Sequence, residues 1–380
     1  MKKCTTFKTV LRIVGIIAII AVIGLAITAC DNGSDGDEGN RVFTNFDDVS
    51  KYLSAQKENT SDSPYTIKIN ISYLRSYSGL KEAFNGYERI GKEYDYLIRY
   101  VILDFSSSTF DKVPSYAFNR LTGSSGMGSW WTVAGKIVGI ILPDSVTSIE
   151  HDAFYYCDCL TSFTIPDSVT RIEDNAFLKC TSLTSVTIGN GVTVIGYNAF
   201  KDCIGLTSVT IPDNVRGLYG FSGCTGLTSV TIGSGVTRIG AEAFLNCTGL
   251  TSIIIPNSVT SIGSNAFQGC TGLTSVTIGN GVTVIEYNAF KDCILNSVTI
   301  PDSVTSIEYR AFYCNTLTSV TFQGEKITVD KFGSFNFNSG NPIHYDSPFM
   351  GNLRDMYLFS ESGSIGTYTR ASSGTTWTKQ

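Results

Sequence analysis

Between residues 136 and 322 the chain repeats one short pattern of apolar and polar positions. In residues 183–203, Leu183, Val186 and Ile188 are apolar, and the residues between them are small and hydroxylated. Val, Ile and Thr favour an extended chain, in which alternate side chains point to opposite faces. This alternation predicts a short strand over residues 183–188, with Val186 and Ile188 facing inward.

The remainder of this unit predicts a second extended stretch and a closing turn. Gly-Asn-Gly at 189–191 ends the strand, because Gly and Asn accept positive φ. Val192 and Ile195 then form another short extended stretch, and residues 197–203 close the unit as a turn or a short helix, with Phe200 and Cys203 facing inward. Other units end the strand with a proline, which has no N–H for a sheet ladder, at Pro166, Pro212, Pro256 and Pro301.

A phenylalanine recurs near the end of each unit. These markers are Phe154, Phe177, Phe200, Phe221, Phe244, Phe267, Phe290 and Phe312, which stand 23, 23, 21, 23, 23, 23 and 22 residues apart. Cysteines follow them at Cys157, Cys180, Cys203, Cys224, Cys247, Cys270, Cys293 and Cys314. One unit cannot bury its own apolar face, so we expect the units to stack, with strands ~4.8 Å apart, a phenylalanine spine and a cysteine column.

Two details of the repeats bear on how they stack. Residues 183–203 and 273–293 differ at one of 21 positions, Gly196 against Glu286, which indicates that a block of four units was duplicated. The unit at 211–224 has lost two residues before its Phe. We expect a local bulge there and no break in the stack.

The repeats resemble those of the BspA-like leucine-rich repeat proteins. That repeat reads roughly Leu-x-x-Val-x-Ile-Pro-x-Ser-Val-x-x-Ile-Gly-x-x-Ala-Phe-x-x-Cys, and the segments LTSVTIPDNV, IPNSVTSIGSNAFQGC and IPDSVTSIEYRAF match it closely. The resemblance covers about residues 136–322. It implies an α/β fold: a curved leucine-rich-repeat solenoid with a parallel β-sheet of ~23-residue repeats, short helices or turns, and caps at both ends. It also implies a bacterial surface protein that binds other proteins or cells.

The chain divides into five segments on these patterns. Residues 1–29 form a signal peptide, and residues 30–42 a flexible acidic tether. Residues 43–135 form an N-terminal cap with degenerate repeats, and residues 136–322 the repeat array. Residues 323–380 form a C-terminal cap and a polar tail.

The amino-terminal segment predicts export and a lipid anchor. Lys and Arg residues precede an apolar run at 13–27, as in a signal peptide, and the small residues before Cys30 resemble a bacterial lipobox. Cys30 would then become the lipidated first residue of a protein attached to the bacterial cell envelope, at the outer membrane or the cell surface. The alternative is a transmembrane anchor, for which the run is short, since a span needs ~20 apolar residues.

Residues 31–42 resemble a calcium loop only in part. Asp31, Asp35 and Gly36 suit one, but the twelfth position is Val42 where such a loop needs Glu. A flexible acidic tether is the simpler interpretation of this composition.

Few residues in the chain suit catalysis, metals or nucleic acids. Only His151 and His344 are histidines, and no metal-protease, phosphate-loop or dinucleotide motif is present, so we expect no enzyme and no cofactor. Scattered carboxylates leave a glycosidase pair open, and an enzyme site within residues 43–135 is a weaker alternative. A net charge of −5 with few basic residues in the repeats argues against nucleic acid.

The cysteine column allows two interpretations. One thiol per repeat forms a line, whereas a zinc site needs four ligands that converge, so we expect no metal. Buried thiols behave as small apolar side chains, but stacked neighbours could also come within disulfide range. We expect buried thiols, with Cys157 and Cys159 as the pair best suited to an exception.

Hydroxyl side chains recur at the two positions of each strand that face away from the core. They are Ser162, Thr164, Ser185, Thr187, Ser208, Thr210, Ser229, Thr231, Ser275, Thr277, Ser297, Thr299, Ser319 and Thr321. Only Ile254, beside Ser252, interrupts them. We interpret this surface as the candidate binding face for protein ligands, either host extracellular matrix or bacterial surface proteins. The alternatives are docking on the loops and caps, including an exposed loop with Trp130 and Trp131, or a passive surface-coat protein with no defined partner.

Overall fold

The computed structural model describes residues 42–44, 52, 62–70, 100–118, 137–324, 366–371 and 376–380. The chain divides into two units, Met1–Arg41 and Val42–Gln380, and all described residues belong to the second. The predicted signal peptide, the lipidation site Cys30, the incomplete calcium loop up to Arg41, and Trp130 and Trp131 therefore lie outside the described residues. Within the described ranges, no helix is long and apolar enough to span a membrane.

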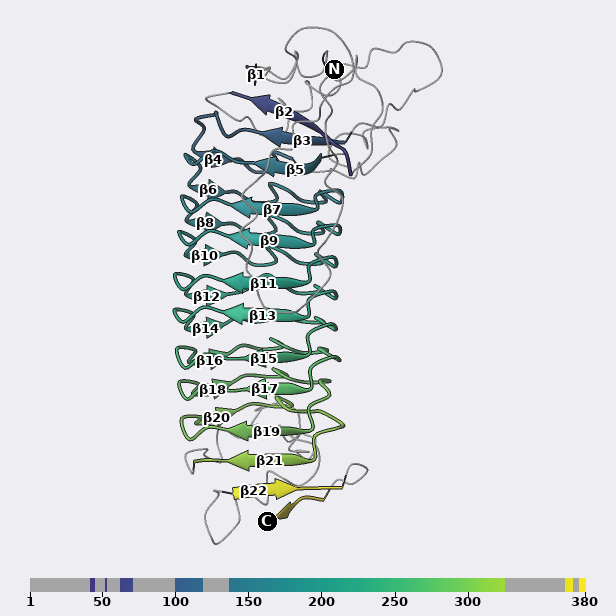
Figure 1. The fold of residues 1–380 in the computed structure, drawn as a ribbon. Coiled ribbons are helices and arrows are strands. Elements are labelled where there is room, and N and C mark those ends of the chain that lie inside the picture. The colour runs from purple at the N-terminus through teal and green to yellow at the C-terminus, as the bar shows by residue number, and fades with distance from the viewer. Residues whose placement is uncertain are drawn as a thin grey trace, which may run out of the picture. The chain divides into compact units, whose positions relative to one another are not determined.

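Each repeat contributes one longer strand and one two-residue strand (Figure 1). The longer strands are β5 (Ile137–Ile141), β7 (Ser162–Ile165), β9 (Ser185–Ile188), β11 (Ser208–Ile211), β13 (Ser229–Ile232), β15 (Ser252–Ile254), β17 (Ser275–Thr277), β19 (Ser297–Ile300) and β21 (Ser319–Phe322). The short strands are β4 (Lys112–Val113), β6 (Ser148–Ile149), β8 (Arg171–Ile172), β10 (Val194–Ile195), β12 (Gly217–Leu218), β14 (Arg238–Ile239), β16 (Ser261–Ile262), β18 (Val284–Ile285) and β20 (Ser306–Ile307).

The strands of successive repeats stack in parallel, so the predicted solenoid fold is confirmed. The short strands form one continuous nine-stranded sheet from β4 to β20. The longer strands follow one another along the stack but fall into separate hydrogen-bonded sheets, which are interrupted between β5 and β7, between β13 and β15, and between β17 and β19. Before them, β1 (Val42–Phe43), β2 (Tyr65–Ile69) and β3 (Val101–Asp104) pair in parallel and join β5.

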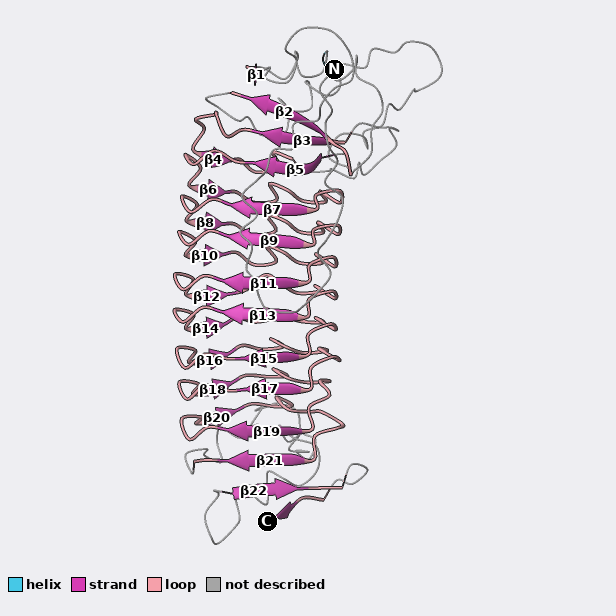
Figure 2. Ribbon diagram, in the orientation of Figure 1, coloured by secondary structure: helices cyan, strands magenta, loops and turns pink. Residues whose placement is uncertain are grey.

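The segment that closes each repeat is a turn (Figure 2). Between β6 and β21 the described repeats contain turns and no helix, which decides between the two predicted forms. Most of these turns place a residue with positive φ two positions before the phenylalanine and another two positions after it, such as Asn198 (φ 57°) and Asp202 (φ 58°). Residues in the left-handed region break the right-handed helical pattern, so the segment forms turns and no helix.

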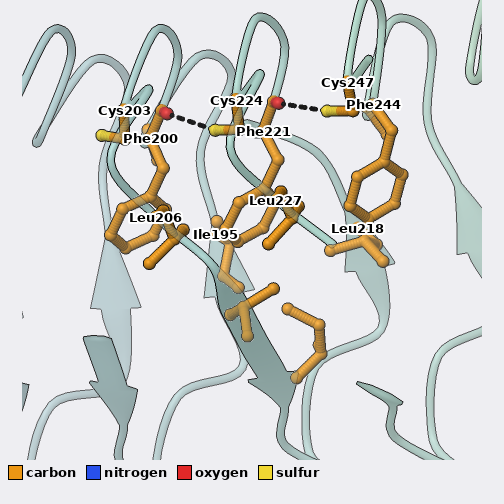
Figure 3. Packing of buried hydrophobic residues seen from close by; sticks show 14 of the residues in the cluster. Ile195, Phe200, Cys203, Leu206, Leu218, Phe221, Cys224, Leu227, Phe244 and Cys247 are labelled. Atoms are coloured by element: carbon orange, nitrogen blue, oxygen red, sulfur yellow. Dashed lines mark hydrogen bonds between the residues drawn. The ribbon is translucent and has the colours of Figure 1, made fainter. Parts of the chain in front are cut away.

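The predicted phenylalanine spine is confirmed. Rings from Phe118 to Phe312 lie almost parallel, with successive centroids 4.8–5.7 Å apart and interplanar angles of 2–12°. Figure 3 shows three of them, Phe200, Phe221 and Phe244, with Leu206, Leu218 and Leu227 packed near them. Each ring of the spine from Phe154 onward is fully buried, and Phe163 packs edge-on against Phe154 and Phe177.

The expected bulge in the short repeat is wrong, although the stack continues as predicted. Leu218 pairs with Ile239 of the next repeat, so β12 keeps its place in the nine-stranded sheet. The turn of this repeat is shorter by the two missing residues. Within it, the Gly220 (φ 98°) carbonyl accepts the Phe200 N–H. A side chain at Gly220 would approach the Gly196 carbonyl to 2.9 Å, so a glycine lets the turn be shortened without displacing the strand.

The turns that link the two strands of a repeat alternate between two types. Proline opens them at Pro166, Pro212, Pro256 and Pro301, and glycine opens the turns between these at Gly189, Gly233 and Gly279. A Cβ on Gly191 would lie 1.9 Å from the Asp167 carbonyl oxygen of the preceding repeat. The Asp167 carboxylate also accepts the Asn190 N–H at 2.7 Å. Each glycine turn therefore packs directly onto the proline turn before it. Because the two types alternate, this contact recurs every two repeats.

The far end of the stack is closed by antiparallel pairing. Strand β22 (Gly366–Thr369) pairs with β21, and β23 (Thr378–Lys379) pairs with β22. Tyr368 and Trp377 are buried there, and Arg370 donates to the Asn315 carbonyl at 2.9 Å. These contacts cover the last apolar layer, which would otherwise meet water.

Candidate binding face

The fourteen predicted hydroxyl side chains lie on one face of the longer strands. In β9 and β11 the order is exposed, buried, exposed, buried, because alternate side chains of a strand point to opposite sides. Twelve of the fourteen are exposed, so the outward assignment is confirmed, whereas their role in binding stays a prediction. The remaining two, Ser319 and Thr321, are half-buried next to β22, where the Thr321 and Thr367 hydroxyls lie 3.0 Å apart.

The hydroxyls form two columns, one of serine and one of threonine. Strand register places Ser208 opposite Ser229 and Thr210 opposite Thr231, and the other paired strands repeat this match. Neighbouring hydroxyls in a column are thus separated by about one strand spacing, ~4.8 Å. We call this surface, from β7 to β21, the hydroxyl face.

Ile254 is the exception on the hydroxyl face. It occupies the threonine column, opposite Thr277, and its side chain is 69% exposed. No other large apolar side chain among the described residues is as exposed. The strand that carries it, β15, begins a separate hydrogen-bonded pair with β17.

The backbone under the hydroxyl face is held by a second series of threonines. Thr184 precedes β9, and its Oγ1 donates to the Thr161 carbonyl of the previous repeat at 3.0 Å. Thr228 donates to Thr207 in the same way at 3.0 Å. Hydrogen bonds between successive repeats, together with the buried residues beneath, keep the hydroxyls in fixed relative positions.

The chemistry of the hydroxyl face is hydrogen bonding without charge. Serine and threonine each donate one hydrogen bond and accept two, and they do not titrate in the physiological range. Charged pairs lie elsewhere, as along the nine-stranded sheet between Arg171 and Glu173 at 2.7 Å and between Arg238 and Glu286 at 3.1 Å. The two columns hold no titratable side chain that could act as a general base toward these hydroxyls.

The cysteine column consists of buried thiols from Cys180 to Cys314, as expected. Cys224 Sγ donates to the Phe200 carbonyl of the preceding repeat at 3.1 Å, and Cys247 repeats this contact with Phe221 (Figure 3). Burial raises the pKa of Cys270 to about 12 and that of Cys180 well above its ordinary value. Cys180 and Cys270 therefore stay protonated, and the thiols of Cys224 and Cys247 donate to turn carbonyls, a role that the sequence alone did not reveal.

The described residues contain no cluster suited to a metal. No group of three or more His, Cys, Asp or Glu side chains converges within that part of the chain. His151 lies exposed in the turn after β6.

Comparison with known proteins identifies the repeats. The family model of the BspA type leucine rich repeat region matches residues 133–251 and 237–365, with six copies. Among curated proteins, no relative matches the chain.

Three solved structures are similar to parts of the chain. A leucine rich cell surface protein from Faecalibacterium prausnitzii A2-165 is 36% identical over 49% of this chain and 45% of its own length, with a TM-score of 0.35. A leucine-rich repeat protein from Bacteroides ovatus ATCC 8483 is 24% identical over 60% of this chain and 73% of its own, with a TM-score of 0.32. A T. pallidum leucine-rich repeat protein is 26% identical over 46% and 68%, with a TM-score of 0.33.

The match of the family model spans more than half of the chain and coincides with the stacked repeats, their phenylalanine spine and their cysteine column. The chain therefore belongs to the BspA-type leucine-rich repeat family.

Proposed function

We propose that this chain is an exported bacterial surface protein that binds protein ligands through its hydroxyl face. The ligands are host extracellular matrix proteins or proteins on other bacterial cells. The observation that carries this proposal is the exposure of twelve hydroxyls in two columns, with Ile254 interrupting the threonine column. Membership of the repeat family supports it, because repeat arrays of this kind present extended binding surfaces.

The hydroxyl face supports weak contacts multiplied over many copies. Tight interfaces usually depend on Trp, Tyr or Arg anchors, and none stands in the two columns between β7 and β21. A neutral polar surface forms hydrogen bonds that replace those with water, each with a small net gain of about 1 kcal/mol. Many copies on one cell would turn such contacts into useful adhesion by avidity.

Attachment to the cell envelope completes this proposal. Cys30, if lipidated, would anchor the chain in a membrane through two or more acyl chains, which hold a protein more stably than one chain does. This lipid anchor would hold the repeats at the cell surface, and the acidic segment after Cys30 would act as the tether.

The test replaces Thr187, Thr231 and Thr277 together by Lys and measures binding to immobilised matrix proteins. Three charges in the middle of the face should abolish binding, because each would lose its hydration against a neutral partner. The matched control replaces Thr225, Thr248 and Thr271, which are exposed in the turns, by Lys. Circular dichroism must show that both variants fold.

Two outcomes would contradict the proposal. Undiminished matrix binding by the first variant would move the site from the hydroxyl face to the loops or caps. Failure of the unmodified protein to bind any matrix protein or cell would favour a passive coat protein.

A further inference from the structure

We propose that the shortened repeat carries a binding site for a neutral sugar, built around the exposed ring of Tyr197. The three turns concerned are those of Phe200, Phe221 and Phe244 (Figure 3). The site lies in these turns, away from the hydroxyl face, so it is independent of the proposed protein binding. The chain supplies its own comparison, because residues 273–293 repeat residues 183–203 almost exactly but are followed by a complete turn.

The shortened turn interrupts a ladder of backbone hydrogen bonds. In the second copy, the Asn288 N–H donates to the Tyr309 carbonyl of the next turn at 3.0 Å, and Asn288 is buried. Asn198 holds the same place in the first copy, but the next turn lacks the residue that would accept from it, and Asn198 is only half-buried. Within the described part of the chain, neither the Asn198 N–H nor the carbonyl of Ala241, on the other side of the shortened turn, has a hydrogen-bond partner. The deletion therefore leaves one backbone donor and one backbone acceptor open.

The side chain of Tyr197 shows the same difference between the copies. Its counterpart Tyr287 is half-buried and stacks on Tyr309 of the next turn, with ring centroids 5.5 Å apart and an interplanar angle of 15°. Tyr197 is 44% exposed, because the shortened turn offers no residue to cover it. Its hydroxyl crosses that turn and donates to the Glu242 carboxylate, two repeats along, at 2.8 Å. A ring held at both ends loses little freedom when a ligand packs on it, which favours binding.

Tyr219 places a second aromatic ring beside the shortened turn. It directly follows β12, and its ring occupies the space that side chains at Gly217 and Gly240 would need. Tyr219 is half-buried, so part of the ring stays at the surface. Two tyrosines from adjacent repeats therefore border the opening.

These groups suit the chemistry of a sugar. The C–H groups on one face of a sugar ring pack against an aromatic ring, and its hydroxyls both donate and accept hydrogen bonds. The Glu242 carboxylate and the Ala241 carbonyl are acceptors, and the Asn198 N–H is a donor, so the site offers both kinds. An aromatic side chain of a partner protein would cover the Tyr197 ring but leave these polar groups unpaired.

The charge of the site selects neutral sugars. Glu242 forms no ion pair within the described residues, so its negative charge is uncompensated there. An acidic sugar would meet this charge at short range, whereas a neutral one would not.

The test is a glycan array probed with the labelled full chain. The array carries neutral oligosaccharides of galactose, glucose and N-acetylglucosamine, together with sialylated forms of the same oligosaccharides. The unmodified protein should bind neutral glycans, and Tyr197→Ala should weaken this binding about tenfold or more, because the stacking surface is lost. Tyr287→Ala is the matched control, since it removes the same residue from the same local sequence and should leave binding unchanged.

A second variant closes the site by restoring the missing residues. Tyr219 and Gly220 are together replaced by Gly-Tyr-Asn-Ala, the four residues that stand at this place, 196–199, in the preceding repeat. The complete turn should cover Tyr197 and abolish glycan binding, while circular dichroism shows that the protein stays folded.

Four results would overturn the proposal: no binding to neutral glycans, equal losses in Tyr197→Ala and Tyr287→Ala, a preference for sialylated glycans, or unchanged glycan binding once the turn is complete. Loss of matrix-protein binding alone in Tyr197→Ala would also overturn it and would make the ring a protein anchor. The proposed function is tested separately, because replacing Thr187, Thr231 and Thr277 by Lys should leave glycan binding intact.

Discussion

Each phenylalanine of the spine lies between the rings of the repeats before and after it. Phe267 is fully buried, and its ring centroid is 5.3 Å from that of Phe244 and 5.1 Å from that of Phe290. Cys270, in the same turn, donates its thiol hydrogen to the Phe244 carbonyl of the previous repeat. At the scale of residues, one ring and one thiol per repeat join each turn to its neighbour.

Replacing Phe267 by Ala should lower the free energy of unfolding by ~3–5 kcal/mol, because a buried ring is lost and two rings face the cavity. Denaturant unfolding followed by circular dichroism measures this change. Ile204→Ala, at a half-exposed turn position, is the control and should change stability by less than about 0.5 kcal/mol. An unfolding curve that Phe267→Ala leaves unchanged would mean that the ring is not packed as described.

The buried thiols make the folding stability depend on pH in the alkaline range. The pKa of Cys270 rises from 9.0 to about 12 on burial, so the folded protein keeps a proton that the unfolded chain releases. Stability is therefore complete below pH 9 and falls as the pH rises toward 12. A thermal melt at increasing pH should show this decline, and the decline should be smaller in Cys270→Ala.

Thiol labelling tests directly whether the cysteines are buried as thiols in the folded protein. Because the thiolate is the reactive form, iodoacetamide should leave the column unlabelled in the folded protein and label it in denaturant. Rapid labelling of Cys270 without denaturant would contradict its burial.

At the scale of elements, the two types of connecting turn fit each other. The glycine turns accept the backbone of the proline turns so closely that Gly191, Gly235 and Gly281 have no room for a Cβ. Aspartate or asparagine from the proline turn caps the next turn, as when Asp213 accepts the Ser234 N–H at 2.6 Å. The first two turns, at Pro143 and Pro166, both carry proline, so the alternation begins only with the second.

Gly191→Ala should destabilise the protein by ~1–3 kcal/mol, the cost of forcing an extra methyl into a packed site. The equivalent position one repeat earlier is Ser168, whose Cβ is accommodated and whose hydroxyl is buried without a hydrogen-bond partner in the described part of the chain. Ser168→Ala is therefore the matched control, and it should be neutral or slightly stabilising. Equal losses for the two variants would show that the turns do not alternate in their packing.

At the scale of the whole molecule, other segments of the chain pack against both ends of the repeat stack. Antiparallel β22 and β23 cover the last repeat, and Arg370 lies over the Trp377 ring at 5.3 Å. At the other end, Phe118 stacks on Phe154 at 5.1 Å, so the residues before the array continue its spine. The amino-terminal unit, Met1–Arg41, is where the proposed anchor would be.

Cys30→Ala should release the protein from membranes, because the acyl chains that we propose on this residue would be absent. Detergent partitioning of cell fractions measures the release, and Cys4→Ala, within the predicted signal peptide, is the control that should leave anchoring intact. If Cys30→Ala still partitions with detergent, residues 13–27 act as a transmembrane span.

The sequence by itself determined the length of the repeat, the parallel direction of its strands and which side chains face the interior. Val186 and Ile188 had to point inward because strand side chains alternate, and Phe200 had to join a column because its spacing is constant. The hydroxyl positions followed from the same alternation, and their exposure was predicted correctly for all but Ser319 and Thr321, which lie beside β22. Their function could not, because binding depends on a partner that the chain does not encode.

Tertiary structure decided what depends on contacts between repeats. The thiol of Cys224 points to the Phe200 carbonyl, 24 residues away, so the choice between disulfides and thiols was set by neighbouring turns. The loss of two residues before Phe221 was absorbed at Gly220, because the hydrogen bonds of β12 on both sides hold the strand in place. The nesting of Gly191 on Asp167 is likewise visible only when two repeats are stacked. Local patterns specify which way a side chain faces, whereas the atom it meets depends on residues more than 20 positions away.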